Sequence, residues 1–147
     1  MAKQLTQPEI EKLLEMLKIS LKETVNFPTK GNSVEFDLIG DSKTDIFINK
    51  IYRGKINPLK YNFGARIKKD GILLLELHIN PNNVHTNPDG SKIVGNHWHI
   101  FTEEHGRKLA YLAEDIDSEK FVENTVLFLE KFNVIKLPSI NYQQELI

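Results

Sequence analysis

Residues 61–79 read YNFGARIKKDGILLLELHI, and this stretch decides the fold class that the sequence predicts. Apolar residues alternate with polar or small ones from Tyr61 to Ile67, a two-residue period that indicates a half-buried strand. Asp70 and Gly71 then form a typical hairpin turn, and residues 72–79 are mostly apolar, as in a central strand. The stretch therefore predicts two antiparallel strands joined by a tight turn.

Further strands are expected on both sides of this hairpin, within about residues 33–113. Alternating apolar residues indicate strands near residues 33–39, 46–52, 97–102 and 107–112. Residues 80–96 contain two prolines and five asparagines, so we expect an ordered loop there, with Asp89 and Gly90 at a turn that needs positive φ. The pattern predicts an antiparallel sheet of about five to six strands.

Helices are expected at both ends of the chain. Thr6 followed by Glu9 is a capping-box pattern and predicts a helix over about residues 6–20. Apolar residues at helical spacing predict a second helix over about residues 118–133, with a tail at 134–147. The expected fold is a single α+β domain over residues 1–147, with its antiparallel sheet flanked by an N-terminal and a C-terminal helix.

The composition narrows the classes of protein. The 147 residues carry a net charge of −1 and contain no cysteine, which excludes disulfides, thiolate zinc sites and cysteine nucleophiles. The apolar run at residues 72–75 is far shorter than the roughly 20 residues that a membrane span needs. The first residues are charged and amphipathic, so we expect no secretory signal, no membrane association and a cytoplasmic location.

Histidine placement is the most unusual feature of the sequence. All five histidines lie within residues 78–105. His97 and His99 are two residues apart on an expected strand, so they project from the same face. His78 ends the preceding strand and His85 lies in the loop between the two strands. We therefore expect His78, His85, His97 and His99 to reach a common spot, with His105 in the next turn.

Three interpretations of these histidines stay open. Neutral imidazoles on one strand face, joined by a third from a loop, suit zinc, iron or nickel. Imidazoles that titrate near neutrality can instead serve as acid and base in a metal-independent cleavage of RNA, which needs no cofactor. The third interpretation is structural: His97 and His99 hydrogen-bond to the asparagine-rich loop and hold it on the sheet.

Positive charge concentrates in the middle of the chain. Residues 46–69 hold seven basic and no acidic residues, whereas residues 114–147 hold seven acidic and three basic ones. This asymmetry favours contact with phosphates, and Tyr52, Tyr61 and Phe63 lie among the basic residues, where they could stack on bases. The alternative is the solvated face of a half-buried sheet. The candidate ligands for phosphate or nucleic acid are Lys50, Arg53, Arg66, Lys68 and Lys108.

Three motifs carry a resemblance to known families: His-Thr-Asn-Pro-Asp-Gly at residues 85–90, His-Trp-His at 97–99 and Gly-Arg-Lys at 106–108. Through them, residues 74–113 resemble a family of small uncharacterised bacterial and prophage proteins. More distantly, they are similar to TumE-type toxins of toxin–antitoxin modules. The resemblance implies a phage, prophage or mobile-element context and a site that contains His85, His97 and His99.

The sequence leads to three hypotheses of function. The first is a toxin-like, metal-independent ribonuclease that acts on RNA, with His85, His97 and His99 as catalytic residues. The second is a non-enzymatic interaction protein, for example an inhibitor of a host defence complex, with a host or antitoxin protein as partner. The third is a module that binds a metal or a small molecule. An exposed strand edge would support a dimer.

Overall fold

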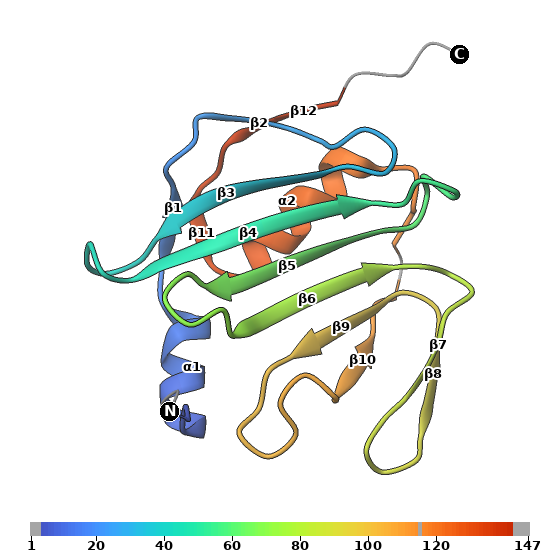
Figure 1. Cartoon of the computed structure of the whole chain (residues 1–147), viewed down its shortest axis with the longest axis horizontal. Helices are drawn as coiled ribbons and strands as arrows, with labels where there is room; N and C mark the ends of the chain where they lie inside the picture. Colours follow the sequence, from blue (N-terminus) through green and yellow to red (C-terminus); the bar gives the residue numbers. More distant parts are fainter. Residues whose placement is uncertain (1–3, 115, 143–147) are drawn as a thin grey trace.

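Strands dominate the structure, a computed structural model that describes residues 4–114 and 116–142 (Figure 1). The two helices of this described part are α1 (Gln7–Glu15) and α2 (Phe121–Lys131). Its twelve strands are, in chain order, β1 (Lys18–Ser20), β2 (Thr24–Asn26), β3 (Ser33–Ile39), β4 (Ile46–Arg53), β5 (Tyr61–Ile67), β6 (Leu73–Ile79), β7 (Val84–Thr86), β8 (Lys92–Val94), β9 (His97–Ile100), β10 (Ala110–Leu112), β11 (Val134–Lys136) and β12 (Ser139–Asn141).

Eight of these strands form one sheet in the order β10-β9-β6-β5-β4-β3-β1-β11. Neighbours in this sheet are antiparallel, except that β1 and β11 pair in parallel. Two further pairs lie outside it: β12 is parallel to β2, and β7 and β8 form an antiparallel hairpin. The four central strands, β3 to β6, follow one another in the chain as a meander.

The fold class predicted from the sequence is wrong. We expected an α+β domain with an antiparallel sheet of about five to six strands between two helices. The described chain is instead mostly β, with an eight-stranded mixed sheet and only 14% helix. The reason is that the short segments after α1 and after α2 join the sheet as strands β1 and β11, with Lys18 of β1 beside Val134 of β11. Strands of three residues are too short to show a two-residue period.

Both helices are shorter than expected. Helix α1 keeps the predicted capping box, in which Thr6 Oγ1 accepts a hydrogen bond from the Glu9 N–H at 3.3 Å. It is capped at Met16, whose extended backbone (ψ 133°) leads into β1 instead of a further helical turn. After α2, Asn133 adopts φ 61° and turns the chain into β11. Neither helix of the described chain is long and apolar enough to span a membrane.

The segments expected as tail and loop contain further strands. Within the expected tail at residues 134–147, the structure has β11 and β12, and residues 143–147 lie outside the described residues. The expected loop at residues 80–96 is largely the β7–β8 hairpin. Both turn predictions are confirmed, because Gly90 has φ 89° in this hairpin and Gly71 has φ 78° between β5 and β6.

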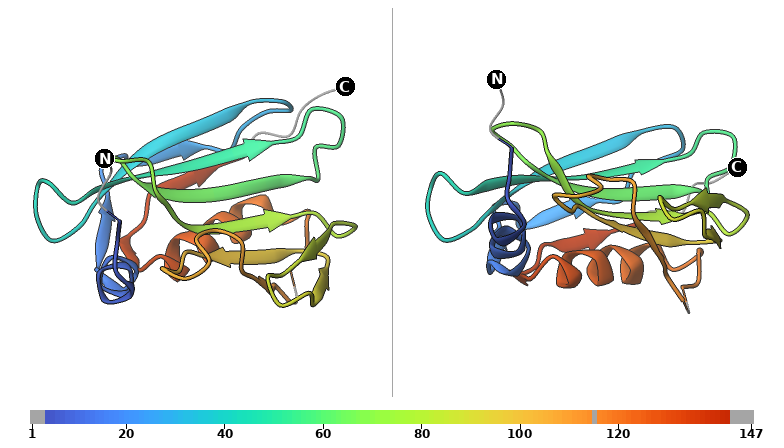
Figure 2. Two further views of the ribbon diagram at one scale, coloured as in Figure 1. Left: turned by 60° about the horizontal axis from the view of Figure 1, so that its bottom comes forward. Right: turned by 90° about the horizontal axis from the view of Figure 1, so that it is seen from below.

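Helix α2 lies along one face of the large sheet, as both views of Figure 2 show. On this face Phe63 stacks on Phe128 with ring centroids 5.4 Å apart, and Trp98 stacks on the same ring at 6.2 Å. Successive residues of a strand point to opposite faces. His97 and His99, on either side of Trp98, therefore project from the face opposite α2, which is the face that carries the candidate site.

Candidate metal centre

The register of β6 and β9 sets the candidate site. His78 of β6 lies opposite His97 of β9, and Glu76 lies opposite His99. Directly opposed residues of adjacent antiparallel strands have Cβ atoms about 5 Å apart. Two rows of cross-strand neighbours therefore bring three imidazoles and one carboxylate together on the face opposite α2.

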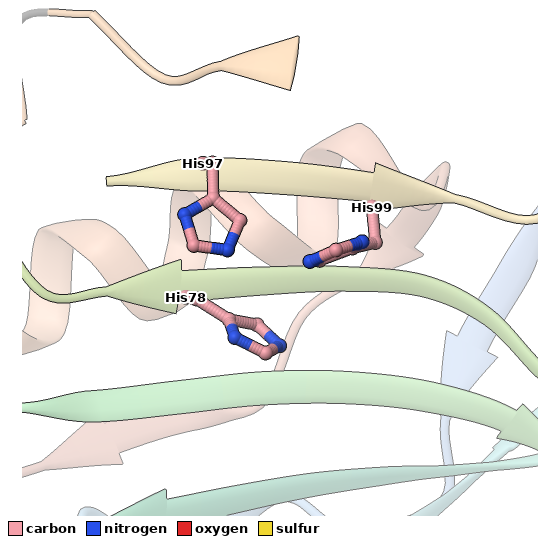
Figure 3. A group of neighbouring side chains, drawn as sticks. All are labelled: His78, His97 and His99. Carbon is pink, nitrogen blue, oxygen red and sulfur yellow. The ribbon is translucent and has the colours of Figure 1, made fainter. Parts of the chain in front are cut away.

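Four imidazoles form one cluster, which we call the histidine cluster: His78, His85, His97 and His99. The ring centroid of His78 lies 5.0 Å from that of His97 and 4.9 Å from that of His99, and the centroids of His97 and His99 are 4.9 Å apart. The ring centroid of His85, in β7, lies 5.6 Å from that of His97 and 4.9 Å from that of His99. Side-chain nitrogens of the three strand histidines lie within 4.8 Å of one another, and their rings converge in Figure 3. The predicted convergence is confirmed, whereas a catalytic role stays a prediction.

Backbone carbonyls orient three of these rings. Since a carbonyl oxygen only accepts, the bonded ring nitrogen carries the hydrogen, and in a neutral imidazole the other ring nitrogen keeps its lone pair. The nitrogens with a lone pair are thus Nε2 of His97, Nε2 of His99 and Nδ1 of His85. The donor–acceptor pairs are His97 Nδ1 to Gly95 O (2.9 Å), His99 Nδ1 to Arg107 O (2.7 Å) and His85 Nε2 to Lys108 O (2.8 Å).

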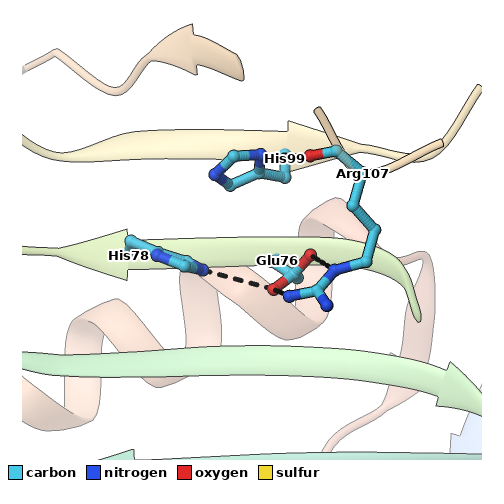
Figure 4. A network of polar contacts seen from close by, with 4 residues as sticks. All are labelled: Glu76, His78, His99 and Arg107. Carbon is cyan, nitrogen blue, oxygen red and sulfur yellow. Dashed lines mark hydrogen bonds and ion pairs between the residues drawn. The ribbon is translucent and has the colours of Figure 1, made fainter. Parts of the chain in front are cut away.

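Glu76 and Arg107 hold the fourth ring. The His78 Nε2–H donates to Glu76 Oε1 at 3.2 Å, and the Arg107 guanidinium binds both oxygens of the same carboxylate at 2.7 Å (Figure 4). Burial by itself would raise the pKa of Glu76, but the hydrogen bonds from His78 and Arg107 outweigh it and lower that pKa to about 2. Glu76 is therefore an anion at neutral pH and fixes the orientation of His78.

Burial keeps the two β9 imidazoles neutral. It lowers the pKa of His99 to about 4, with a further contribution from nearby His78, and it also lowers the pKa of His97. His97 is 1% exposed and His99 is 8% exposed. A neutral imidazole with one free lone pair is the form that binds a transition metal.

The β7–β8 hairpin carries His85 to the cluster, and the buried side chain of Asn87 holds the hairpin in place. Asn87 Nδ2 donates to the Ala110 carbonyl at 3.0 Å, and Asn87 Oδ1 accepts from the Ala110 N–H at 2.8 Å. This pair of bonds joins the hairpin to β10. His97 also bonds to the segment before it, at Gly95, whereas His99 bonds to Arg107.

The fifth histidine lies apart from the cluster. His105 Nε2 is 3.6 Å from Glu104 Oε2, in the turn that follows β9. Of the predicted catalytic residues, the structure thus brings His85, His97 and His99 together. His78 joins them through its place opposite His97.

The basic residues predicted as phosphate ligands do not share one surface. Lys50 and Arg66 line a hollow of about 350 Å³ that His78 borders. Lys68 is engaged with Asp37, at 3.0 Å between Nζ and Oδ2. Two of the five predicted residues therefore line this hollow. Lys108 is exposed and does not line it, although its carbonyl oxygen accepts the hydrogen bond from His85.

Arg53 projects to the face that carries α2, since it lies an odd number of residues from Lys50 on the same strand. Its Nε donates to the Pro58 carbonyl at 3.0 Å, and its guanidinium lies 4.6 Å from the centroid of the Phe121 ring. Tyr61 and Phe63 are buried on this face as well, 3% and 1% exposed. Neither aromatic ring is available to stack on an external base.

Glu76 is the site residue that the sequence interpretation missed. It stands in the apolar run of residues 72–79, two residues before His78. That spacing was the available signal, because two polar residues at a two-residue period inside a central strand share one face. The two hydrogen bonds from Arg107 depend on the turn between β9 and β10, which no periodicity describes.

Comparison with known proteins gives a family but no characterised relative. The model of a family of unknown function (DUF6978) matches residues 5–134 of the chain. No curated protein and no solved structure matches it. The predicted likeness to an uncharacterised family is confirmed in this general form, while the prophage context and the similarity to TumE-type toxins stay predictions.

Proposed function

The chain belongs to DUF6978, a family of unknown function, and from that premise we propose that it binds a divalent transition metal at His78, His97 and His99. Imidazole nitrogen is a preferred ligand of zinc, copper, nickel and iron. Three histidine ligands leave a fourth tetrahedral position, which His85 or a water molecule would fill. Zinc is the ion we expect, because it is bound tetrahedrally by histidine without any cysteine.

The observation that carries the proposal is the spacing of the three ligand atoms, which all lie within 4.8 Å of one another. In a tetrahedral zinc site with bonds of about 2.0–2.1 Å, ligand nitrogens are about 3.4 Å apart. The nitrogens therefore need to approach one another by roughly an ångström, which small side-chain rotations achieve. Their strands are adjacent and fixed in register, so the backbone already holds the geometry.

The surroundings of the rings support the same function. Metal-binding histidines almost always donate their second ring N–H to a carbonyl or carboxylate, which orients the ring and raises its basicity. His97 and His99 donate to carbonyls, and His78 donates to the Glu76 carboxylate. A cluster that served packing alone would not need each ring oriented in this way.

The same geometry supports a metal-independent ribonuclease less well. Such an enzyme needs a protonated imidazole as general acid beside a neutral one as base. A positive charge on His99 would lie about 4.9 Å from the ring centroids of three other imidazoles. Glu76, the carboxylate that could offset this charge, is already bound by Arg107. Four convergent imidazoles are more easily accommodated around a metal ion than around an imidazolium.

The experiment that tests the proposal is a titration of the untagged protein with Co²⁺, followed by visible absorption. Tetrahedral cobalt gives strong bands in the visible region, and we expect them to saturate at one equivalent per chain. His78→Gln and His97→Gln should each weaken binding by about 100-fold or more, since each removes one of three ligands. The matched control is His105→Gln, which removes a histidine outside the cluster and should bind cobalt as the native protein does.

A second measurement uses the native chain, because His97 is buried and its replacement could disturb the fold. Addition of Zn²⁺ should shift the imidazole nitrogen resonances of the cluster and leave those of His105 unchanged. The proposal is overturned if the native protein shows no stoichiometric cobalt bands and no zinc-dependent shift. It is also overturned if His105→Gln weakens binding as much as the cluster variants do.

A further inference from the structure

A hollow opens directly beside the histidine cluster because one row of the sheet lacks a side chain. Lys50, Gly64 and Glu76 are cross-strand neighbours on β4, β5 and β6. With only a hydrogen at Gly64, the space between Lys50 and Glu76 stays open, and the resulting hollow measures about 350 Å³. His78 is one of its lining residues, so the hollow adjoins the proposed metal centre at this ligand.

The rim of the hollow carries an excess of positive charge. Three cationic side chains line it, Lys50, Arg66 and Arg107, against the lining carboxylate of Glu76 and that of Glu35, which lies opposite Lys50 and pairs with Arg66. Arg66 donates one N–H to Glu35, and Arg107 donates two to Glu76. A guanidinium has five N–H donors, so both arginines keep donors for a further anion. Lys50 forms no ion pair within residues 4–114 and 116–142.

A second hollow adjoins the first and offers an aromatic ring. It measures about 260 Å³ and shares Tyr52, Asn62 and His78 with the hollow over Gly64. Tyr52 is 42% exposed, unlike the buried Tyr61 and Phe63. An exposed tyrosine ring on a sheet surface is a platform on which a planar base can stack. The two hollows together suit a ligand with an anionic end and a planar end.

We propose that these hollows bind a nucleotide, with its phosphate over Gly64 between Lys50, Arg66 and Arg107 and its base against Tyr52. The inference rests on the proposed metal centre, because His78 belongs to both. Cationic side chains with free donors recognise a phosphate through charge-assisted hydrogen bonds. The phosphate lies beside the metal, so the same site brings a nucleotide and a metal ion together. A free mononucleotide and a single-stranded RNA share this chemistry.

Isothermal titration of the zinc-loaded protein with inorganic phosphate, AMP and a short single-stranded RNA tests the inference. We expect AMP to bind more tightly than phosphate, and Tyr52→Leu to remove that difference. Lys50→Gln should weaken AMP binding about tenfold, as the loss of one charge-assisted contact predicts. Gly64→Ala should weaken it as well, since the added methyl group would project into the hollow and meet Leu73 Cδ2 at 3.0 Å.

Lys43→Gln is the matched control, because it removes one positive charge from an exposed lysine in the turn between β3 and β4. It should leave AMP affinity unchanged. Tighter binding of the RNA identifies a strand as the ligand, tighter binding of AMP identifies a free nucleotide, and either result supports the inference. Equal AMP affinity in the native protein, Lys50→Gln and Gly64→Ala overturns it.

The proposed metal centre and the proposed nucleotide site can be tested separately. Cobalt titration of Lys50→Gln and Gly64→Ala measures metal binding alone, and we expect both variants to bind cobalt with the stoichiometry of the native protein. Normal cobalt binding without AMP binding overturns the nucleotide site and leaves the centre. AMP binding that Lys50→Gln weakens, in a chain that takes up no cobalt, overturns the centre and supports the charged hollow. If the native protein binds neither cobalt nor AMP, both proposals are overturned.

Discussion

Lys18 and the histidine cluster are both buried polar groups, yet their hydrogen bonding differs. The Lys18 ammonium donates to three backbone carbonyls, those of Leu14 at 3.2 Å, Met16 at 2.8 Å and Phe132 at 2.9 Å. It also lies 3.7 Å from the centroid of the Phe132 ring. Within the described chain, His97 has one bonded ring nitrogen and a second one without a hydrogen-bond partner.

This difference separates a structural group from a binding group. An ammonium has three N–H donors, so Lys18 is fully satisfied by its own chain and ties α1, β1 and the end of α2 together. The imidazoles of the cluster are oriented by one bond each and keep a lone pair that only an external group can use. Burial of a polar group alone therefore does not indicate a binding site. Several buried groups that converge, each with one atom hydrogen-bonded and another without a partner, do indicate one.

The largest expected effect concerns Lys18. Lys18→Met removes the donor of three buried carbonyls and should lower the free energy of unfolding by about 3 kcal/mol, close to 1 kcal/mol for each orphaned acceptor. Denaturant unfolding followed by circular dichroism measures it. Lys22→Met, which alters an exposed lysine of the same segment, should change stability by less than about 0.5 kcal/mol. A Lys18→Met protein as stable as the native one would contradict the structural role.

The second prediction concerns the pH dependence of that contact. Burial lowers the pKa of Lys18 to about 7, against the opposing effect of Asp41, while an unfolded lysine titrates near pH 10.4. Between these values the unfolded chain binds more protons, so the free energy of unfolding should rise from pH 7 to 9.5, by about 3 kcal/mol. Below pH 7 Lys18 contributes no further change. In Lys18→Met this rise should be absent, and a rise of equal size would contradict its assignment to Lys18.

The third prediction tests how the cluster is oriented. Glu76→Gln keeps the shape of the side chain but removes the charge that faces His78 and Arg107. Loss of such a partner behind a metal ligand typically costs 10–100-fold in affinity, and we expect about tenfold weaker zinc binding. Competition with a chromophoric chelator measures it. Glu35→Gln, a carboxylate on the same face paired with Arg66, serves as control, and equal losses in both variants would contradict the role of Glu76.

The histidine cluster could be predicted from the sequence because its determinants are local. A two-residue period places His97 and His99 on one face, and the turn at Gly90 returns the chain between His85 and that strand. The same period also places Lys50 and Arg53 on opposite faces, although both belong to the basic segment at residues 46–69. The alternation of side chains along a strand is thus a better predictor of which residues share a surface than the charge of a segment.

The parts that could not be predicted depend on contacts between distant segments. Strand β1 lies between β3 and β11, and its pairing with β11 joins Lys18 and Ile19 to residues more than a hundred positions later; no pattern within three residues encodes that pairing. The satisfaction of Lys18 by the Phe132 carbonyl is equally non-local. The sequence therefore predicts the histidine cluster better than the role of Lys18, because the hydrogen bonds of Lys18 form only when α1 and the end of α2 lie together in the folded chain.

The smallest expected effect extends the comparison to a third kind of buried polar group. Asn49 of β4 is fully buried on the face of α2, and neither its Oδ1 nor its Nδ2 has a hydrogen-bond partner in the described chain. All N–H donors of the Lys18 ammonium are hydrogen-bonded, and each cluster histidine has one hydrogen-bonded ring nitrogen, whereas the Asn49 amide has no hydrogen bond. Burial of an amide without partners costs free energy, and Asn49→Leu should raise the free energy of unfolding by about 1 kcal/mol.

Denaturant unfolding measures this gain, and Asn62→Leu is the comparison, because Asn62 lies partly exposed on the opposite face and its replacement relieves no buried amide. If Asn49→Leu instead destabilises the protein, a buried water must satisfy the amide, and Asn49 then belongs with Lys18 among the structural anchors. If the gain is found, the buried amide of Asn49 lowers the free energy of unfolding. A buried polar atom without a hydrogen-bond partner would then indicate a ligand site only where several such groups converge and are oriented, as in the histidine cluster.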